Sequence, residues 1–286
     1  MRSPAFDLQS HSHCSDGALG PAAVVAAAAR AGVRLLALTD HDTVAGVAEA
    51  RAAARAHRLQ FIAAVELSAV DPAGEDLHLL GYLVDDRDPV LAERLTAFCR
   101  DRAGRIERMA GALEGLGWEL DRTVLGGREN PGRPHLAAAA FAHPANALRL
   151  REERLGDAGA LLEAYLIPGR PAYARRTIPT IADAIDVVHA AGGVAVWAHP
   201  FWDLEAAQQV EACVRRFAAL GLDGVEAFYP AHGPREARLL ADLAAELDLL
   251  TTGSADFHGP AHPRFSRFRA FALHGCEPRL GPLAAA

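Results

Sequence analysis

The chain has 286 residues, of which 51% are hydrophobic and 23% charged, and its formal net charge is −7. This composition is ordinary for a soluble globular protein with a sizeable core, and the acidic balance gives no general reason to bind nucleic acid or an anionic membrane. All 29 basic residues are arginines, which excludes a Walker-type phosphate loop and a Schiff-base lysine.

The cysteines are far apart in the chain and form no CxxC pair; they are Cys14, Cys99, Cys213 and Cys276. No uncharged apolar run reaches the roughly 18 to 20 residues that a membrane helix needs. The N-terminus does not resemble a secretory signal. A reduced, cytoplasmic protein is therefore expected.

Short apolar runs alternate with alanine-rich helical stretches along most of the chain. Strands are expected at 6–8, 35–39, 61–67, 77–83, 193–200, 224–229 and 249–258. Helices are expected at about 21–31, 43–57, 180–191, 205–220 and 234–247. This alternation predicts an α/β fold with a parallel sheet, open or closed into a barrel.

The region from about 90 to 170 follows a different pattern. The stretch LAERLTAFCRDRAGRIERMAGALEGLGWEL places apolar residues at helical spacing opposite a charged face, and no clear strand follows it. We therefore expect a helical insertion, rich in arginine, over residues 96–168. The strands before and after it would form one barrel from residues 1–95 and 169–286.

Histidines and acidic residues lie in or directly after most of the strand-like runs. They are His11, His13, Asp16, Asp40, His41, Glu66, His78, His199, Glu226, Asp256 and His258. Because the carboxyl ends of the strands form the active-site face of parallel α/β folds, these side chains should converge. One histidine at a strand end is usually structural, but so many buried imidazoles and carboxylates would be costly without a cation.

This pattern predicts a metal centre. Imidazole mixed with carboxylate, with no thiolate required, suits Mn²⁺, Zn²⁺ or Fe²⁺. One glutamate bridging two metals would hold them a few ångströms apart, an arrangement that favours in-line displacement at phosphorus. The absence of a G-x-S-x-G motif and the scattered cysteines argue against a serine or cysteine hydrolase.

The segments DLQSHSHCSDG, LALTDHD, AAVELS, LHLLGY, WAHP and GSADFH together resemble the PHP (polymerase and histidinol phosphatase) phosphoesterase family, over nearly the whole chain. The resemblance implies a distorted (β/α)7 barrel with a trinuclear metal centre, manganese being the expected metal. The segment GRPHLA in the insertion resembles the subgroup of nucleoside 3',5'-bisphosphate phosphatases. These enzymes remove the 3'-phosphate of pAp-like nucleotides and can act as 5'-to-3' exonucleases on short RNA.

The family's metal ligands can be carried over by position. The first metal would be held by Gln9, His11, Glu66 and Asp256. The second would share Glu66 and add His78 and His199, and the third would use Asp16, His41 and His258. The resemblance thus implies Glu66, His199 and Asp256 as residues of the catalytic centre.

Gln9 departs from the family pattern. The family's first motif is usually DLHxHxxxSDG, so Gln9 stands where its first histidine belongs. An amide oxygen can coordinate a hard ion but is a weaker donor than imidazole. His13 aligns with a non-ligand position two residues beyond the usual pair. We expect a first site that is looser, filled by a different metal, or reshaped with the help of His13, while the other two sites still bind.

The insertion carries the expected substrate contacts. Arg133 and His135 stand at the start of a predicted helix, where N–H groups and a guanidinium suit a phosphate. In the resembling subgroup this segment grips the 5'-phosphate. Arg170, Tyr173 and Arg175 are further candidates, although arginines in such loops are more often solvated than not. Either His135 or a metal-bound water would protonate the leaving ribose oxygen.

Three aromatic residues, Trp197, Trp202 and Phe257, flank the expected site and could stack on a base, although core packing is the simpler role for Trp197. The expected partner is a small phosphorylated nucleotide or a short 5'-phosphorylated oligonucleotide, with no membrane and no stable nucleic-acid partner. Two alternatives stay open. One is a PHP phosphatase for another small phosphate ester, with histidinol phosphate disfavoured by the insertion. The other is a metal-binding or nucleotide-binding protein whose turnover is weakened by Gln9.

Overall fold

The computed structural model describes residues 4–71, 74–123 and 131–285. Contacts along the chain divide it into two compact units, one made of residues 1–96 and 179–286 and the other of residues 97–178. We call them the barrel unit and the helical unit. The expected insertion overlaps the helical unit, which continues to Ile178, and its residues 124–130 lie outside the described ones.

Among the described residues, seven strands form one sheet in which neighbours follow chain order. They are β1 (Phe6–Asp7), β2 (Leu35–Leu38), β3 (Gln60–Asp71), β4 (Gly74–Tyr82), β5 (Val194–Trp197), β6 (Gly224–Phe228) and β7 (Leu250–Gly253). The sheet curls until its last strand meets its first: Leu8 N donates to Gly253 O at 3.2 Å, and Ser10 forms a parallel bridge with Phe257. The expected seven-stranded barrel is therefore confirmed.

One strand contradicts the expectation of a parallel sheet. Strand β4 is antiparallel to both of its neighbours, β3 and β5, whereas the other neighbouring pairs are parallel. Only a short link joins Asp71 at the end of β3 to Gly74 at the start of β4. Parallel strands need a crossover of about a dozen residues or more, so two strands that end and begin this close in the chain pair antiparallel.

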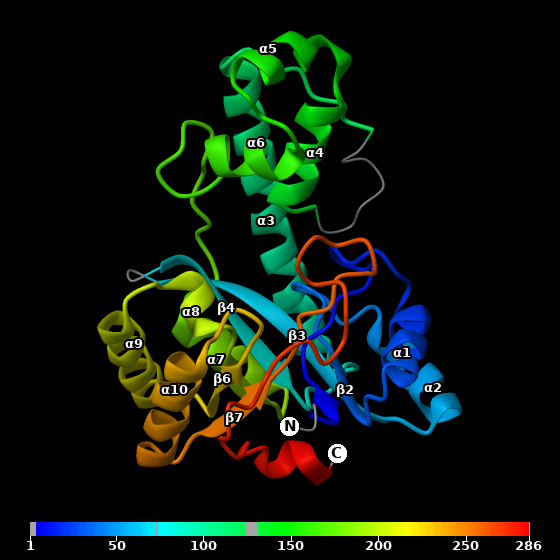
Figure 1. Cartoon of the computed structure of the whole chain (residues 1–286), viewed down its shortest axis with the longest axis vertical. Coiled ribbons are helices and arrows are strands. Elements are labelled where there is room, and N and C mark those ends of the chain that lie inside the picture. Colours follow the sequence, from blue (N-terminus) through cyan, green and yellow to red (C-terminus); the bar gives the residue numbers. More distant parts are fainter. Residues whose placement is uncertain (1–3, 72–73, 124–130, 286) are drawn as a thin grey trace. The chain divides into compact units, whose positions relative to one another are not determined.

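The helices of the barrel unit cover the outside of the sheet, with α1 and α2 beside β2 and with α9 and α10 on the side of β6 and β7 (Figure 1). They are α1 (Pro21–Arg30), α2 (Val47–His57), α7 (Ile181–Ala190), α8 (Pro200–Asp203), α9 (Ala207–Ala219) and α10 (Pro234–Glu246), and the short 3₁₀ helix η2 covers Gly281–Ala285. The expected helices are present, although α2 begins at Val47 and not at residue 43.

The strands read as continuous apolar runs because both of their faces are covered. Every residue of β2 (LLAL) and of β6 (GVEAF) is buried, as expected for barrel strands with helices outside and side chains inside. Where such a strand ends, the chain turns toward solvent and can carry polar side chains. The barrel thus positions those side chains on a rigid frame.

The helical unit is built from short helices packed on a long one. Helix α3 (Pro89–Gly115) runs into it from the barrel unit, and α4 (Arg133–Ala142), η1 (Pro144–Asn146), α5 (Ala147–Glu152) and α6 (Ala158–Tyr165) follow. Its core includes Met109, Leu113, Trp118, Leu136 and Leu161, all at most 1% exposed. None of the helices in the described part of the chain is long and apolar enough to cross a bilayer.

Candidate metal centre

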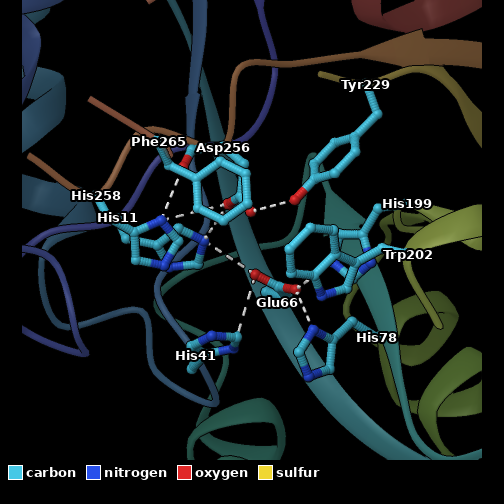
Figure 2. Close-up of a pocket in the computed structure, with 10 residues that line it drawn as sticks. All are labelled: His11, His41, Glu66, His78, His199, Trp202, Tyr229, Asp256, His258 and Phe265. Carbon is cyan, nitrogen blue, oxygen red and sulfur yellow. Dashed lines mark hydrogen bonds and ion pairs between the residues drawn. The ribbon is translucent and has the colours of Figure 1, made fainter. Parts of the chain in front are cut away.

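Imidazoles and carboxylates from six of the barrel strands converge on one pocket (Figure 2). This pocket has a volume of about 130 Å³ and is lined by His11, His41, Glu66, His78, His199, Trp202, Tyr229, Asp256, His258 and Phe265. Nearly all of these residues lie at or just past the carboxyl ends of the strands. The exceptions are Glu66, which lies within β3 opposite Leu80, and His78, which lies within the reversed strand β4 opposite Ser68 of β3.

Glu66 of β3 is the centre of the cluster. Its side chain is 1% exposed, and its Oε2 lies 3.0 Å from His11 Nε2 and 3.6 Å from His41 Nδ1. Its Oε1 lies 2.8 Å from His78 Nδ1 and 3.4 Å from His199 Nε2. Figure 2 shows these imidazoles directed at Glu66 from different sides. One carboxylate that meets four imidazoles through both oxygens can be shared between two cations.

Two aspartates complete the cluster. Asp256 Oδ1 lies 3.2 Å from His11 Nε2. The Asp16 carboxylate lies 3.4 Å from His258 Nε2 and 3.6 Å from His41 Nε2. Three groups have ligand atoms within 4.8 Å of one another: His11, Asp16, His41 and His258; His41, Glu66 and His78; and His11, Glu66 and Asp256.

The electrostatics of the cluster keep its carboxylates charged in spite of burial. Burial raises the pKa of Glu66, but the nearby imidazoles of His41 and His78 outweigh burial and hold that pKa well below its usual value. The pKa of Asp256 is lowered to about 2, because the surrounding imidazoles outweigh burial in the same way. Burial lowers the pKa of His11, but contacts with Asp256 and Glu66 raise it well above its usual value. Protons on imidazole thus supply positive charge that a divalent cation could supply instead.

The donor atoms of the cluster suit such a cation. His11 Nε2 and Asp256 Oδ1 are buried and lie 3.2 Å apart, yet neither makes a hydrogen bond of normal geometry. Buried polar atoms are nearly always hydrogen-bonded, so two such atoms at one point indicate a ligand. Nitrogen and oxygen donors together fit Mn²⁺, Zn²⁺ or Fe²⁺, and we conclude that the residues fit a centre of divalent metals.

Gln9 is within the cluster but does not present its oxygen to it. Its side chain is buried, and its Nε2 donates to Glu66 Oε2 at 3.0 Å. Its Oε1 faces Ser254, whose hydroxyl lies 3.4 Å away and donates more closely, at 2.6 Å, to Glu226 Oε1. His13 is exposed and belongs to none of the metal-type groups found among the described residues. Of the three alternatives for the first site, the one in which His13 helps to reshape it therefore gains no support.

Several residues that contact the expected ligands were missed by the sequence reasoning. The Tyr229 hydroxyl donates to Asp256 Oδ2 at 2.8 Å, and Asp203 Oδ2 lies 3.5 Å from His199 Nδ1. Glu226, by contrast, was already a candidate from its strand, and its Oε2 accepts from the backbone N–H of His199 at 3.0 Å. Two signals were present in the sequence: Tyr229 ends the strand run GVEAFY, and Asp203 follows His199 by four residues, one helical turn.

Asp40, which also follows a strand, organises the first loop and does not join the metal-type groups. It accepts from Ser12 N at 2.7 Å, from the Ser12 hydroxyl at 2.6 Å and from the Ser15 hydroxyl at 2.7 Å. These bonds fix the turn that carries His11 and Asp16 toward the pocket. The strand-end position alone therefore did not identify a ligand.

The expected substrate residues lie in the helical unit. Arg133 and His135 begin α4 and are half-buried, and His135 Nδ1 accepts from Gly132 N at 3.0 Å. Arg170 and Arg175 are exposed, and the Arg105 guanidinium lies 5.2 Å from the Tyr173 ring centroid. Their part in substrate binding stays a prediction.

The three aromatic candidates differ in how exposed they are. Trp197 and Phe257 are 0% and 3% exposed and belong to the core, whereas Trp202 is 43% exposed and lines the pocket.

Comparisons with known proteins agree with this geometry. A family model described as the PHP domain matches residues 7–117. The chain is 32% identical over 259 residues to the 3',5'-nucleoside bisphosphate phosphatase of Chromobacterium violaceum. The aligned residues cover 89% of this chain and 87% of that protein. It is also 32% identical over 257 residues to the 5'-3' exoribonuclease of Haemophilus influenzae, covering 89% of this chain and 90% of that protein.

A third relative differs in its named substrate. The phosphoribosyl 1,2-cyclic phosphate 1,2-diphosphodiesterase of Eggerthella lenta is 33% identical over 272 residues, covering 88% of this chain and 94% of that protein. Among solved structures, an amidohydrolase from Chromobacterium violaceum with bound sulfate and no metal superposes with a TM-score of 0.83 at 30% identity, covering 99% of this chain and 96% of that one. The three named relatives act on phosphate esters of different kinds.

Proposed function

This chain belongs to the PHP family of metal-dependent phosphoesterases, and we propose that it removes the 3'-phosphate from nucleoside 3',5'-bisphosphates. The observation that carries the phosphoesterase activity is Glu66 surrounded by four imidazoles. The choice of substrate is supported by the relatives named for a nucleoside bisphosphate and for RNA. The arginine-bearing GRPHLA segment at the start of α4 supports it further. Trimming of short 5'-phosphorylated RNA by the same chemistry is part of the proposal.

We propose two or three divalent ions, manganese foremost, as the cofactor. The residues that would hold them are Gln9, His11, Asp16, His41, Glu66, His78, His199, Asp256 and His258. When bound, such ions supply Lewis acidity, which polarises a phosphoryl group and makes water a better nucleophile. Gln9 is the weakest member of this set, because its amide nitrogen faces Glu66. It can act as a ligand only after its side-chain amide flips, so that Oε1 and not Nε2 faces the metal.

The residues around the ligands hold them in place. Tyr229 donates to Asp256 and leaves that carboxylate's Oδ1 directed at His11. Asp203 faces the Nδ1 of His199, and a carboxylate at this position sets the tautomer and orientation of a metal-binding imidazole. These contacts pre-organise the centre without touching the substrate.

His135 is proposed as the donor of a proton to the leaving ribose oxygen. Its Nδ1 accepts a hydrogen bond from Gly132 N, so in the neutral ring the proton is on Nε2. Nε2 is therefore the atom that would donate. A water molecule at the metal centre is the alternative donor.

The substrate proposal is tested by phosphate release from adenosine 3',5'-bisphosphate with Mn²⁺, with 5'-AMP, 3'-AMP and ribose 1,2-cyclic phosphate 5-phosphate run in parallel. We expect rapid release from the bisphosphate and slow release from both monophosphates. Preference for the cyclic phosphate would transfer the assignment to the activity for which the Eggerthella lenta relative is named. No turnover of any of these compounds would contradict both assignments.

Arg133 is proposed to bind the 5'-phosphate. Arg133→Ala should raise KM about tenfold for adenosine 3',5'-bisphosphate, the size of effect typical of a lost charge-assisted hydrogen bond, and should leave KM for 3'-AMP nearly unchanged. Arg235→Ala on α10, an exposed arginine, is the matched control. Equal rises in KM for both substrates would count against a contact with the 5'-phosphate.

A further inference from the structure

Trp202 is an exposed aromatic residue at the mouth of the metal pocket. Of the chain's 3 tryptophans, Trp118 and Trp197 are 1% and 0% exposed, whereas Trp202 is 43% exposed. Indole is one of the largest apolar side chains, and leaving it in water forgoes the stabilisation that its burial would give. A tryptophan left open beside a polar site is typical of a surface that binds a planar ligand.

The position of Trp202 is defined although its ring is open. Its backbone N–H donates to His199 O at 2.8 Å, which ties it to an expected metal ligand. Phe265 and Tyr229 pack edge-on against the indole, with ring centroids 5.6 Å and 6.2 Å away and interplanar angles of 64° and 68°. These perpendicular contacts hold the indole in place, and 43% of the residue stays exposed to a ligand.

A cation lies beside this ring. The Arg264 guanidinium carbon is 5.3 Å from the Trp202 ring centroid, and the Arg264 side chain is exposed. Guanidinium groups and indoles are the two kinds of side chain on which unstacked nucleobases most often lie. Because Arg264 is exposed, it can shift to admit a flat group and then cover it.

The size of the pocket explains why a substrate would reach these residues. Sites that enclose a drug-sized ligand measure about 300 to 1,000 Å³, whereas this pocket measures about 130 Å³. It can hold metal ions and a phosphoryl group, but not the rest of a nucleotide. The nucleoside must extend past the pocket's lining, and Trp202 is the most exposed of the lining aromatic residues.

We propose that Trp202 and Arg264 form a nucleobase subsite, in which the base of the substrate stacks on the Trp202 indole next to the Arg264 guanidinium. This inference rests on the proposed nucleotide substrate. Stacking accepts any base because every base has a π-face. The subsite would therefore select nucleotides over sugar phosphates, with little preference among the bases.

The first test compares two substrates that differ only in the base: adenosine 3',5'-bisphosphate and its abasic analogue 1-deoxyribofuranose 3,5-bisphosphate, in which hydrogen replaces the base. Trp202→Ala should raise KM for the nucleotide about tenfold, within the range seen for loss of base–aromatic stacking, and change KM for the abasic analogue less than about twofold. Trp202→Phe should retain most of the affinity. Leu220→Ala, which removes an exposed apolar side chain of the same unit, should leave both KM values unchanged.

An equal rise in KM for both substrates would overturn the subsite, since Trp202 would then only support His199. If the wild-type protein hydrolyses neither substrate, the proposed function fails, and the subsite is judged by binding alone.

The binding test uses tryptophan fluorescence, because Trp202 is the tryptophan that solvent and ligands can reach. With Mg²⁺ present, 5'-AMP should quench the emission and ribose 5-phosphate should not. Trp202→Phe should abolish the quenching. Quenching by both compounds, or by neither, would refute the subsite. So would quenching by 5'-AMP that is as strong in Trp202→Phe as in the wild-type protein.

Discussion

The helical unit and the pocket of the barrel unit balance their charges in different ways. In the helical unit, Arg149 Nε lies 2.6 Å from Glu153, and its guanidinium carbon lies 4.2 Å from the Trp118 ring centroid. Arg122 pairs with Glu107 and Glu114. In the barrel, the described residues that line the pocket include carboxylates and imidazoles but no arginine.

This difference indicates that the charges of the helical unit serve its structure, whereas those of the pocket serve its chemistry. A guanidinium is permanently charged, so the pairs in the helical unit are complete without any other ion. An imidazole carries its charge only while it holds a proton. The carboxylates of the pocket therefore meet partners that can exchange protons for a metal, and metal binding there should release protons.

The strongest effect is expected at the residue that joins the imidazoles. Glu66→Gln should lower kcat/KM by more than about 1,000-fold, above the 10- to 100-fold that supporting residues of metal sites usually cost. Metal content measured by mass spectrometry should fall with it. Glu246→Gln, at an exposed glutamate of α10, is the control. A Glu66→Gln protein with full metal content and full activity would contradict the claim that Glu66 and its imidazoles form a metal centre.

A substitution in the helical unit should lower the stability of the protein and leave its metal content unchanged. Trp118→Ala removes a fully buried indole and should lower the free energy of unfolding by about 3–5 kcal/mol, measured by urea denaturation of the metal-free protein. Leu116→Ala, at a side chain that is 41% exposed, should change it by less than about 0.5 kcal/mol. Metal content of the native protein should be the same in both variants. A loss of metal in Trp118→Ala would show that the two units are not separate in this respect.

A smaller effect is expected one contact away from the ligands. Asp203→Ala should lower metal affinity or kcat/KM about 10- to 100-fold by leaving His199 Nδ1 without its carboxylate, and Asp203→Asn should recover part of that loss. Asp248→Ala, at a side chain that is 93% exposed, serves as the control. Wild-type affinity and turnover in Asp203→Ala would rule out a positioning role.

The smallest change should be a gain. Gln9→His adds an imidazole where an amide now bonds to Glu66, and it should tighten the weakest metal site about tenfold. Titration of the chelator-treated protein with Mn²⁺ measures the affinity of this site. Gln208→His, at an exposed position of α9, is the control. Unchanged metal binding would show that position 9 contributes no ligand in either form.

Most of the barrel could be predicted because its strands and helices differ in their apolar periodicity. The direction of β4 could not, since a strand pattern reads the same in both directions. The sequence reasoning placed strands at 61–67 and 77–83 within a parallel sheet. In the structure β3 and β4 extend to Asp71 and back from Gly74, which are too close in the chain for a crossover.

The candidate site was predictable as far as its residues follow strands. His11, His41, His199 and His258 were found in this way, and the pocket brings them together. Tyr229 was missed because a tyrosine that ends an apolar run looks like core, and its bond to Asp256 spans 27 positions in the chain. The orientation of the Gln9 amide depends on Glu66, which lies 57 positions away in the chain, so no local pattern could show it.

The reversed strand β4 also makes the barrel unequally tolerant of insertions. His78 enters the pocket through its pairing opposite Ser68, and side chains along a strand alternate between its two faces. One residue inserted into β4 ahead of His78 would turn the imidazole away from Glu66. His41, His199 and His258 lie where strands pass into loops, which absorb changes of length more readily. Over evolutionary time, loops around this centre can therefore lengthen freely, whereas the part of β4 from Gly74 to His78 must keep its length.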